Sequence, residues 1–114
     1  MSNNLTAIIT GGGSGIGEAT SKRMLDAGYE VISVGLHEPD WTHERFTSLN
    51  CDLLDEEATV RLAAQLAKNH TVTHFVHNAG MIRQKPLEDV TVADLHDLTQ
   101  LHSAAALIFT QALV

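Results

Sequence analysis

The sequence predicts an α/β fold in which the strands of a parallel sheet alternate with helices. Short apolar runs alternate along the chain with longer segments of helical spacing. A glycine-rich turn stands between the first apolar run and the first helical segment. The composition, 114 residues with 44% apolar and 18% charged side chains, suits one domain with a modest core.

Each expected helix, strand or loop is predicted from residues within or next to its own segment. Apolar and β-branched runs predict strands at residues 5–10, 30–35, 47–51 and 73–77. Helical spacing predicts one helix over 15–27, ended by Gly28 as a C-terminal cap, and another over 55–68 with acidic residues in its first turn. Pro39 and its charged neighbours make 36–46 a loop. Thr91 and Asp94 have capping-box spacing, with Asp in place of Glu, and open the last helix.

The turn at residues 10–17, Thr-Gly-Gly-Gly-Ser-Gly-Ile-Gly, predicts a binding site for a nucleotide pyrophosphate. Glycines adopt backbone angles closed to other residues and let a phosphate approach the main chain. The first turn of the following helix adds unpaired N–H groups and the positive end of the helix dipole. The residues assigned to this site are Gly11, Gly13, Ser14, Gly15, Ile16 and Gly17. Close packing of strand and helix is the alternative reason for the glycines.

Right-handed crossovers predict the strand order 3-2-1-4, which is the first half of a doubly wound Rossmann fold. The winding then reverses between the first and fourth strands, and ligands bind at the carboxyl ends of strands beside such a reversal. The glycine turn and Asn78-Ala79-Gly80, which follows the fourth strand, therefore face one site. Ala79 and Gly80 leave room for a ribose, and Asp52 can accept a hydrogen bond from an adenine amino group. Alternatively, Asp52 caps the following helix, and 78–80 is an ordinary turn.

Four segments in this order resemble the short-chain dehydrogenase/reductase family and cover almost the whole chain. They are the Gly-x-x-x-Gly-x-Gly spacing of Gly11, Gly15 and Gly17 after Thr10, then Cys51-Asp52-Leu53, then Asn78-Ala79-Gly80, and finally the long helix from His102 to Ala112. The resemblance implies that Asp52 and Leu53 lie against the adenine ring. It also implies that the intact protein is an oxidoreductase, which moves hydride between NAD(P) and an alcohol or carbonyl substrate.

The proton donor of that family does not occur in this sequence. Members carry a Tyr-x-x-x-Lys pair, whereas the single tyrosine here, Tyr29, has Ser33 four positions on. We therefore expect 1–114 to be the cofactor-binding half, with the catalytic half absent, and to be inactive alone. His102 takes the position of the family's catalytic asparagine, and a histidine lining the interior or an interface is the alternative.

Two other function classes are open. The first is a non-catalytic nucleotide-binding or interaction module, which needs the glycine turn but no proton donor. The second is an extended-type nucleotide-sugar epimerase or reductase. That class resembles Gly-x-x-Gly-x-x-Gly, which the glycines of this turn do not match.

The choice between NAD and NADP depends on the end of the second strand. A carboxylate there bonds the ribose 2′-hydroxyl of NAD, whereas an arginine nearby suits the 2′-phosphate of NADP. Alignment with the family places Gly35 and Leu36 at these cofactor-contacting positions, so neither selector is present. Gly35 leaves space for a phosphate that a protonated His37 could meet, although Glu38 opposes it. The sequence predicts NAD or NADP, with a slight preference for NADP.

The charge and cysteine content limit the partners. Fourteen acidic and seven basic residues give a formal net charge of −7 without a basic cluster, which argues against nucleic acid and membranes. The histidines lack metal-site spacing. A single cysteine, Cys51, and an N-terminus without a signal pattern predict a cytoplasmic protein.

An open fourth strand and an apolar last helix, which includes Leu107 and Phe109, predict a homo-oligomer.

Overall fold

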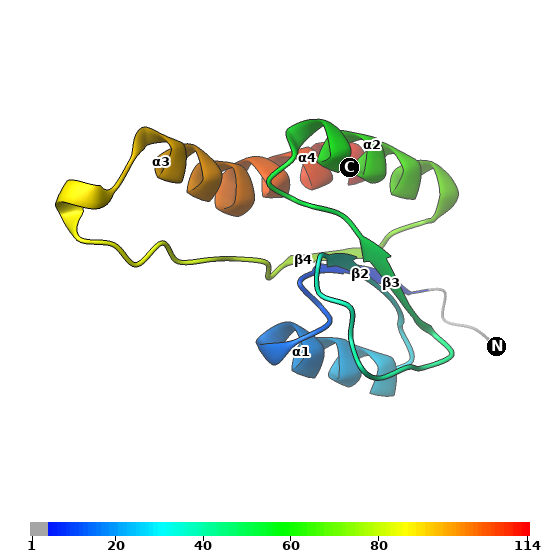
Figure 1. Cartoon of the computed structure of the whole chain (residues 1–114). Coiled ribbons are helices and arrows are strands. Elements are labelled where there is room, and N and C mark those ends of the chain that lie inside the picture. The colour runs from blue at the N-terminus through cyan, green and yellow to red at the C-terminus, as the bar shows by residue number, and fades with distance from the viewer. Residues whose placement is uncertain (1–4) are drawn as a thin grey trace.

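The computed structural model describes residues 5–114 and contains one four-stranded parallel sheet with helices on both faces (Figure 1). The strands are β1 (Thr6–Thr10), β2 (Glu30–Gly35), β3 (Phe46–Asn50) and β4 (His74–His77), and the helices are α1 (Gly15–Asp26), α2 (Glu56–Asn69), α3 (Val92–Thr99) and α4 (Ala105–Leu113). The sheet order β3-β2-β1-β4 confirms the prediction. The elements from β1 to β4 lie within one residue of the expected bounds.

The alternation of side chains along β1 divides the core between the two faces of the sheet. Ala7 and Ile9 pack with Leu25 of α1 on one face. Ile8 points to the other face and belongs to the cluster that contains Leu66 of α2 and Phe109 of α4. Figure 1 accordingly shows α1 on one side of the sheet and α2 and α4 on the other. Because β1 is central and covered on both faces, its carboxyl end is held firmly in place.

The helix ends follow the local signals in the sequence. After α1, Gly28 has a φ of +95°, which confirms it as a C-terminal cap. Asp55 caps α2 by accepting a hydrogen bond from the Ala58 N–H at 3.1 Å, so Asp52 is not the cap of this helix. The capping box of Thr91 and Asp94 is present in both directions. It fixes the start of α3 as the sequence predicts.

A π-helical turn over Gln100–Ala104 joins α3 to α4. The last helix therefore runs from Val92 to Leu113 with one local widening. Within α4, Phe109 is fully buried and stacks on Phe75 with 5.3 Å between the ring centroids. Leu107 is exposed instead. Phe109 is thus a core residue rather than part of a contact face, and Leu107 is the apolar side chain that α4 presents outward.

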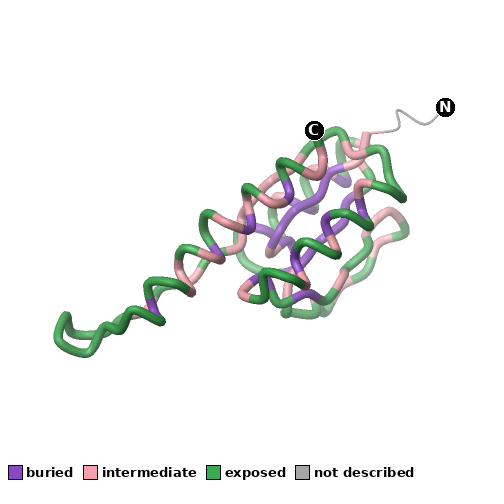
Figure 2. The backbone as a smooth tube through the Cα atoms, turned by 90° about the horizontal axis from the view of Figure 1, so that it is seen from above, coloured by how far each residue is buried: buried purple, intermediate pink, exposed green. Residues whose placement is uncertain are grey.

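Residues 81–99 form an arm that extends away from the sheet. It consists of a strap, residues 81–90, which includes a short 3₁₀ turn (Leu87–Asp89), and of α3, which leads back to the body. Figure 2 shows that the backbone of this projection is mostly exposed. No helix of the described residues is long and apolar enough to cross a membrane. The arm begins directly after Gly80, so it is connected to the predicted site.

Candidate functional site

A cavity of about 260 Å³ opens at the carboxyl ends of the strands. It is lined by nine of the predicted site residues, namely Gly11, Gly13, Ser14, Gly35, Leu36, Asp52, Leu53, Ala79 and Gly80. Four other predicted residues, Gly15, Ile16, Gly17 and Asn78, lie beside it without lining it. The fold thus brings together four segments that are far apart in the sequence, in the place expected from the strand order.

The backbone of the turn explains its glycines. Gly11 and Gly15 have φ values of +69° and +56°, in the left-handed region that favours glycine. A Cβ at Gly17 would overlap the carbonyl oxygen of Gly11, so Gly17 lets the helix approach the strand. A Cβ at Gly15 would have nothing within 4 Å. Gly17 therefore serves packing, whereas Gly15 borders open space that a ligand can fill.

The N-terminus of α1 supplies hydrogen-bond donors beside this space. Ser14 is the N-cap residue, and its carbonyl accepts the N–H of Glu18 at 3.0 Å. The preceding N–H groups, of Gly15, Ile16 and Gly17, have no acceptor within the helix. The Ile16 side chain is 79% exposed, so Ile16 offers the site its main chain only. Among the described contacts, the Ser14 hydroxyl makes no cap hydrogen bond, and it lines the cavity.

Thr10 connects the two strands that flank the cavity. Its hydroxyl oxygen accepts the N–H groups of Asn78 and Ala79, each at 3.0 Å, and lies 2.9 Å from His77 Nδ1. The Asn78 side-chain amide donates to the Gly11 carbonyl at 3.1 Å. Asn78 therefore holds the glycine turn in place rather than lining the cavity. The segment 78–80 is part of a hydrogen-bonded junction, not an isolated turn.

The opposite wall of the cavity follows β3. Asp52 Oδ1 accepts the N–H of Leu54 at 3.0 Å, which shapes the turn, and the Asp52 side chain stays exposed. A carboxylate has lone pairs for further donors, so Asp52 can still bind a ligand N–H. Leu53 is buried and adds an apolar contact. Cys51 lines the same wall, and burial raises the pKa of its thiol.

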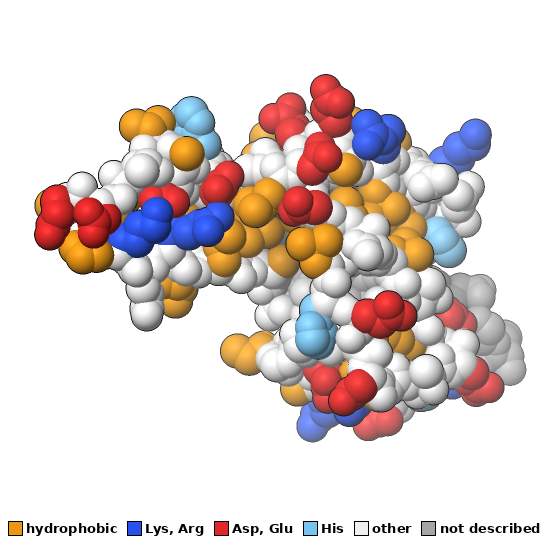
Figure 3. Space-filling model, in the orientation of Figure 1, with side chains coloured by type: hydrophobic (Ala, Val, Ile, Leu, Met, Phe, Trp, Pro, Cys, Tyr) orange, Lys and Arg blue, Asp and Glu red, His pale blue; other side chains and the backbone are white. Residues whose placement is uncertain are grey.

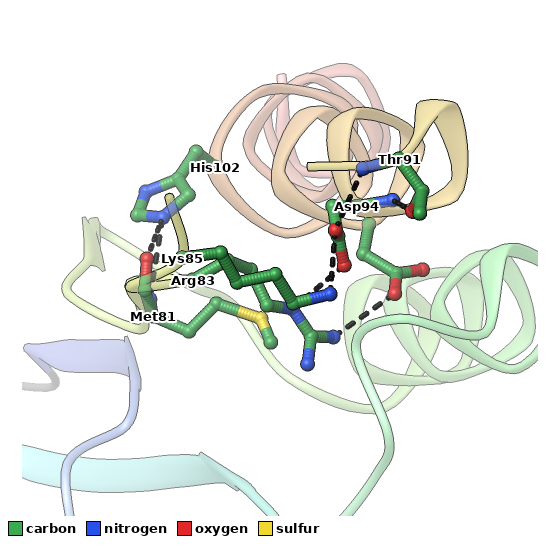
Figure 4. Close-up of polar contacts among 7 residues, drawn as sticks. Met81, Arg83, Lys85, Thr91, Asp94 and His102 are labelled. Carbon is green, nitrogen blue, oxygen red and sulfur yellow. Dashed lines mark hydrogen bonds and ion pairs between the residues drawn. The ribbon is translucent and has the colours of Figure 1, made fainter. Parts of the chain in front are cut away.

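His102 lies beside Gly80 and Met81, which line the cavity. Its Nε2 is 2.9 Å from the Met81 carbonyl oxygen and 3.2 Å from the Met81 nitrogen (Figure 4). A Cβ at Gly80 would come within 2.8 Å of the imidazole Cε1, so this glycine makes room for the ring. The ring belongs to the π turn, and such turns are frequent at functional sites. His102 therefore fixes the point at which the chain leaves the cavity.

Farther along the arm, two ion pairs join the strap to α3. Arg83 binds Asp97 at 2.9 Å and Lys85 binds Asp94 at 2.8 Å, so the strap is attached to α3 at successive points (Figure 4). The Lys85 hydrogen bond and the Thr91 N–H lower the pKa of the Asp94 carboxyl to about 2. In Figure 3 the basic side chains of the arm lie among acidic ones. These basic groups are neutralised locally.

Several residues that line the cavity were not among the predicted site residues, namely Ser33, Cys51, Leu54, Met81 and Leu101. His37, named from the sequence as a partner for a phosphate, lines the cavity as well. Ser33 is a buried polar residue within β2, and polarity inside an apolar strand is a signal that could have marked it. Leu101 gave no such signal, because it lines the cavity from a distant helix. The single tyrosine, Tyr29, precedes β2 and packs against His74 at the opposite end of the sheet, away from the cavity.

The comparisons with known proteins agree with this geometry. The model of the short chain dehydrogenase family matches residues 5–114. The 2-dehydro-3-deoxy-D-gluconate 5-dehydrogenase of Bacillus subtilis is 31% identical over 114 residues, which cover 93% of this chain. A crystal structure from Beutenbergia cavernae, with NADP at low occupancy, is 28% identical and superimposes with a TM-score of 0.85 over 99% of this chain. A 4-hydroxyisoleucine dehydrogenase in complex with NADH has a TM-score of 0.88 over 96% of the chain, at 22% identity, and so supports the fold.

The chain spans less than half of the length of these proteins. It covers 45% of the Bacillus subtilis dehydrogenase and 48% of the Beutenbergia cavernae chain. The matched part contains the glycine turn, the cavity and the last helix.

Proposed function

Because this chain belongs to the short-chain dehydrogenase family, we propose that residues 1–114 are the NAD(P)-binding part of an oxidoreductase. The substrate class is an alcohol or a carbonyl compound. The observation that carries the proposal is the cavity between the glycine turn and 78–80, beside the N-terminus of α1.

The residues around the cavity fit a dinucleotide. The N–H groups of the α1 N-terminus and the Ser14 hydroxyl would bind the pyrophosphate, in the space that Gly15 leaves open. Asp52 would accept a hydrogen bond from the adenine amino group, and Leu53 would contact the ring. Ala79 and Gly80 would leave room for the ribose next to the nicotinamide. When bound, the nicotinamide supplies the hydride chemistry.

These residues bind and orient the cofactor, whereas the proton transfer needs a group outside them. The sequence contains no Tyr-x-x-x-Lys pair, and Tyr29 lies at the other end of the sheet. We propose that residues 1–114 bind the cofactor without turning over substrate by themselves. The same observation supports a second candidate function, a nucleotide-binding module without catalysis. A Tyr-x-x-x-Lys pair in the same polypeptide, beyond these residues, would decide for the oxidoreductase.

A calorimetric titration of the chain with NAD⁺ and NADP⁺ tests the cofactor site. The Gly15→Asn variant should lose binding, because the new side chain occupies the space beside the α1 N-terminus. Asn tolerates the left-handed φ of this position, so the fold should persist. Gly28→Asn is the matched control, since Gly28 also has a positive φ but lies at the other end of α1. Equal affinity in the two variants, or no binding by the native chain, would contradict the proposal.

We also propose that the protein is a cytoplasmic homo-oligomer. Among the described strands, β4 pairs on one side only, with β1, and Leu107 is exposed on α4. The single thiol, Cys51, suits a reducing compartment. Leu107→Asp should lower the mass measured by light scattering across a concentration series, whereas the exposed variant Glu57→Gln should not. A monomer at every concentration in the native protein would contradict this assembly.

A further inference from the structure

The segment between β2 and β3, residues 36–45, runs along α1 from one end of the helix to the other. We call it the β2–β3 loop. Its odd-numbered residues from 39 to 45 are half-buried, whereas the even-numbered ones between them are exposed. At the far end of the helix, the Arg45 guanidinium donates to the Leu25 carbonyl at 2.6 Å. The loop is therefore an ordered layer on α1 rather than a free connection.

At its start, the β2–β3 loop covers Gly13 of the glycine turn. Gly13 is buried, and a Cβ added to it would come within 3.2 Å of the His37 carbonyl oxygen and 3.3 Å of Pro39 Cδ. The loop thus lies in direct contact with the Gly13 backbone. On the side of β4, the turn is held by the Asn78 amide, which donates to the Gly11 carbonyl. The β2–β3 loop provides the second support of the turn.

Trp41 fastens the middle of the β2–β3 loop to α1. Its ring lies against Phe46, with 4.1 Å between the ring centroids, and packs on the apolar cluster between α1 and the sheet. The Lys22 ammonium lies over the indole, 4.9 Å from its centroid, and binds the Glu18 carboxylate at 2.9 Å. Glu18 belongs to the first turn of α1, beside the N–H groups that face the cavity. Trp41 is therefore connected to the end of the helix at which the pyrophosphate would bind.

We propose that Trp41 is a positioning residue of the cofactor site, which holds the β2–β3 loop on α1 so that the loop keeps the glycine turn in its ligand-binding conformation. This inference rests on the proposed cofactor site. Glycine loses more backbone freedom on ordering than any other residue, and residues 11–13 are all glycines. A turn that is already ordered before the ligand arrives binds it more tightly. Because NAD and NADP share the pyrophosphate, the effect is the same for both.

Titration calorimetry with NAD⁺ and NADP⁺ tests this role. Trp41→Ala should weaken the binding of both cofactors by the same factor, about tenfold, which corresponds to ordering about one backbone residue. Trp41→Phe keeps an aromatic ring in the same place and should retain the native affinity. Met24→Ala is the matched control, since Met24 packs on the same apolar cluster but belongs to α1. It should lower the stability without changing the affinity.

Hydrogen exchange followed by mass spectrometry separates positioning from packing. Without cofactor, the peptide that contains the turn, residues 10–17, should exchange faster in Trp41→Ala than in the native chain. Met24→Ala and Trp41→Phe should leave its exchange unchanged. Pro39→Gly removes the contact with Gly13 from the loop side, at a residue outside the apolar cluster. It should also give faster exchange and weaker binding, and it decides the matter even where Trp41→Ala does not fold.

The possible outcomes separate this inference from the proposed function. If the native chain binds a cofactor that Trp41→Ala and Pro39→Gly bind equally tightly, or if Met24→Ala weakens binding as much, the positioning role is refuted while the cofactor site stands. A loss confined to one of the two cofactors also overturns it, because the pyrophosphate is common to both. If the native chain binds neither cofactor, the proposed function fails together with this inference. Circular dichroism of each variant confirms that it is folded.

Discussion

The hydroxyl of Thr10 lies 2.9 Å from Nδ1 of His77, and this contact joins the carboxyl ends of β1 and β4. The Thr10 oxygen already accepts two backbone N–H groups, from Asn78 and Ala79, so its own proton is donated to His77. His77 then carries its proton on Nε2, which donates to the Leu101 carbonyl at 2.8 Å. A continuous hydrogen-bonded chain thus connects the glycine turn, β4 and the π turn.

Replacing Thr10 with Val should therefore destabilise the protein although the two side chains have similar shapes. The change leaves two N–H groups and the His77 acceptor without a partner in a buried place, which costs about 2 kcal/mol or more. Thr10→Ser keeps the hydroxyl and should cost less. Urea denaturation measures both free energies of unfolding. A smaller loss in Thr10→Val than in Thr10→Ser would show that the methyl group, not the hydroxyl, is what the site needs.

The sequence was sufficient for the sheet and for most of the cavity, because both depend on local patterns. The apolar runs define the strands, and the strand order then brings Gly11, Asp52 and Gly80 to one place. The role of Gly15 can also be predicted from its own position, because glycine both allows the positive φ of the turn and leaves the space beside it free of a side chain. Consistency between local signals and the global fold made these predictions possible.

The arm and the interior of the last helix could not be predicted in this way. The strap has no hydrophobic period, and it is held by Arg83 and Lys85 through partners that lie 14 and 9 residues away. Phe109 belongs to a helix with apolar residues on more than one face, so its burial depends on where β4 and Phe75 lie. The pattern alone does not say which of these faces is covered.

The contact of His102 with Met81 predicts that a smaller side chain at position 102 makes the folded protein more stable. A single atom, Nε2, faces both the N–H and the carbonyl of Met81, and it can accept or donate but not both at once. The amide of an asparagine has one acceptor and one donor. His102→Asn should therefore raise the free energy of unfolding, by up to about 1 kcal/mol. Thermal denaturation checks this, with His102→Ala as the control that satisfies neither group and should be less stable. A less stable His102→Asn would refute the argument.

The ion pair of Asp94 with Lys85 predicts how stability depends on pH. The Lys85 hydrogen bond and the Thr91 N–H hold the pKa of Asp94 at about 2 in the folded protein, against about 4 for an unfolded aspartate. A carboxyl whose pKa is lower in the folded than in the unfolded state stabilises the folded protein at pH values above its unfolded pKa. This contribution is lost as the pH falls from about 4 to about 2. The native chain should thus exceed Asp94→Asn in stability most clearly above pH 4, and the difference should shrink toward pH 2.

Urea denaturation at several pH values measures this difference for Asp94→Asn. Glu57→Gln is the control, because it removes a carboxylate from an exposed ion pair with Arg61, at 4.0 Å, and should change stability little. A difference between the native chain and Asp94→Asn that stays constant from pH 6 to pH 2 would contradict the assigned role of the carboxylate.

Cys51 offers a chemical measure of the cavity, because it is the single thiol in the sequence and lines the proposed cofactor cavity beside Asp52 and Leu53. The side chain is 7% exposed, and burial raises the pKa of the thiol, so the reactive thiolate is scarce at neutral pH. A maleimide should react more slowly with the folded chain than with the chain in urea. Saturating NAD⁺ should slow the folded reaction further by covering the wall that contains Cys51. Mass spectrometry follows the modification, and Gly15→Asn should abolish the protection without changing the rate in the absence of cofactor. Protection that persists in Gly15→Asn would mean that NAD⁺ binds elsewhere and that the glycine turn is not its site.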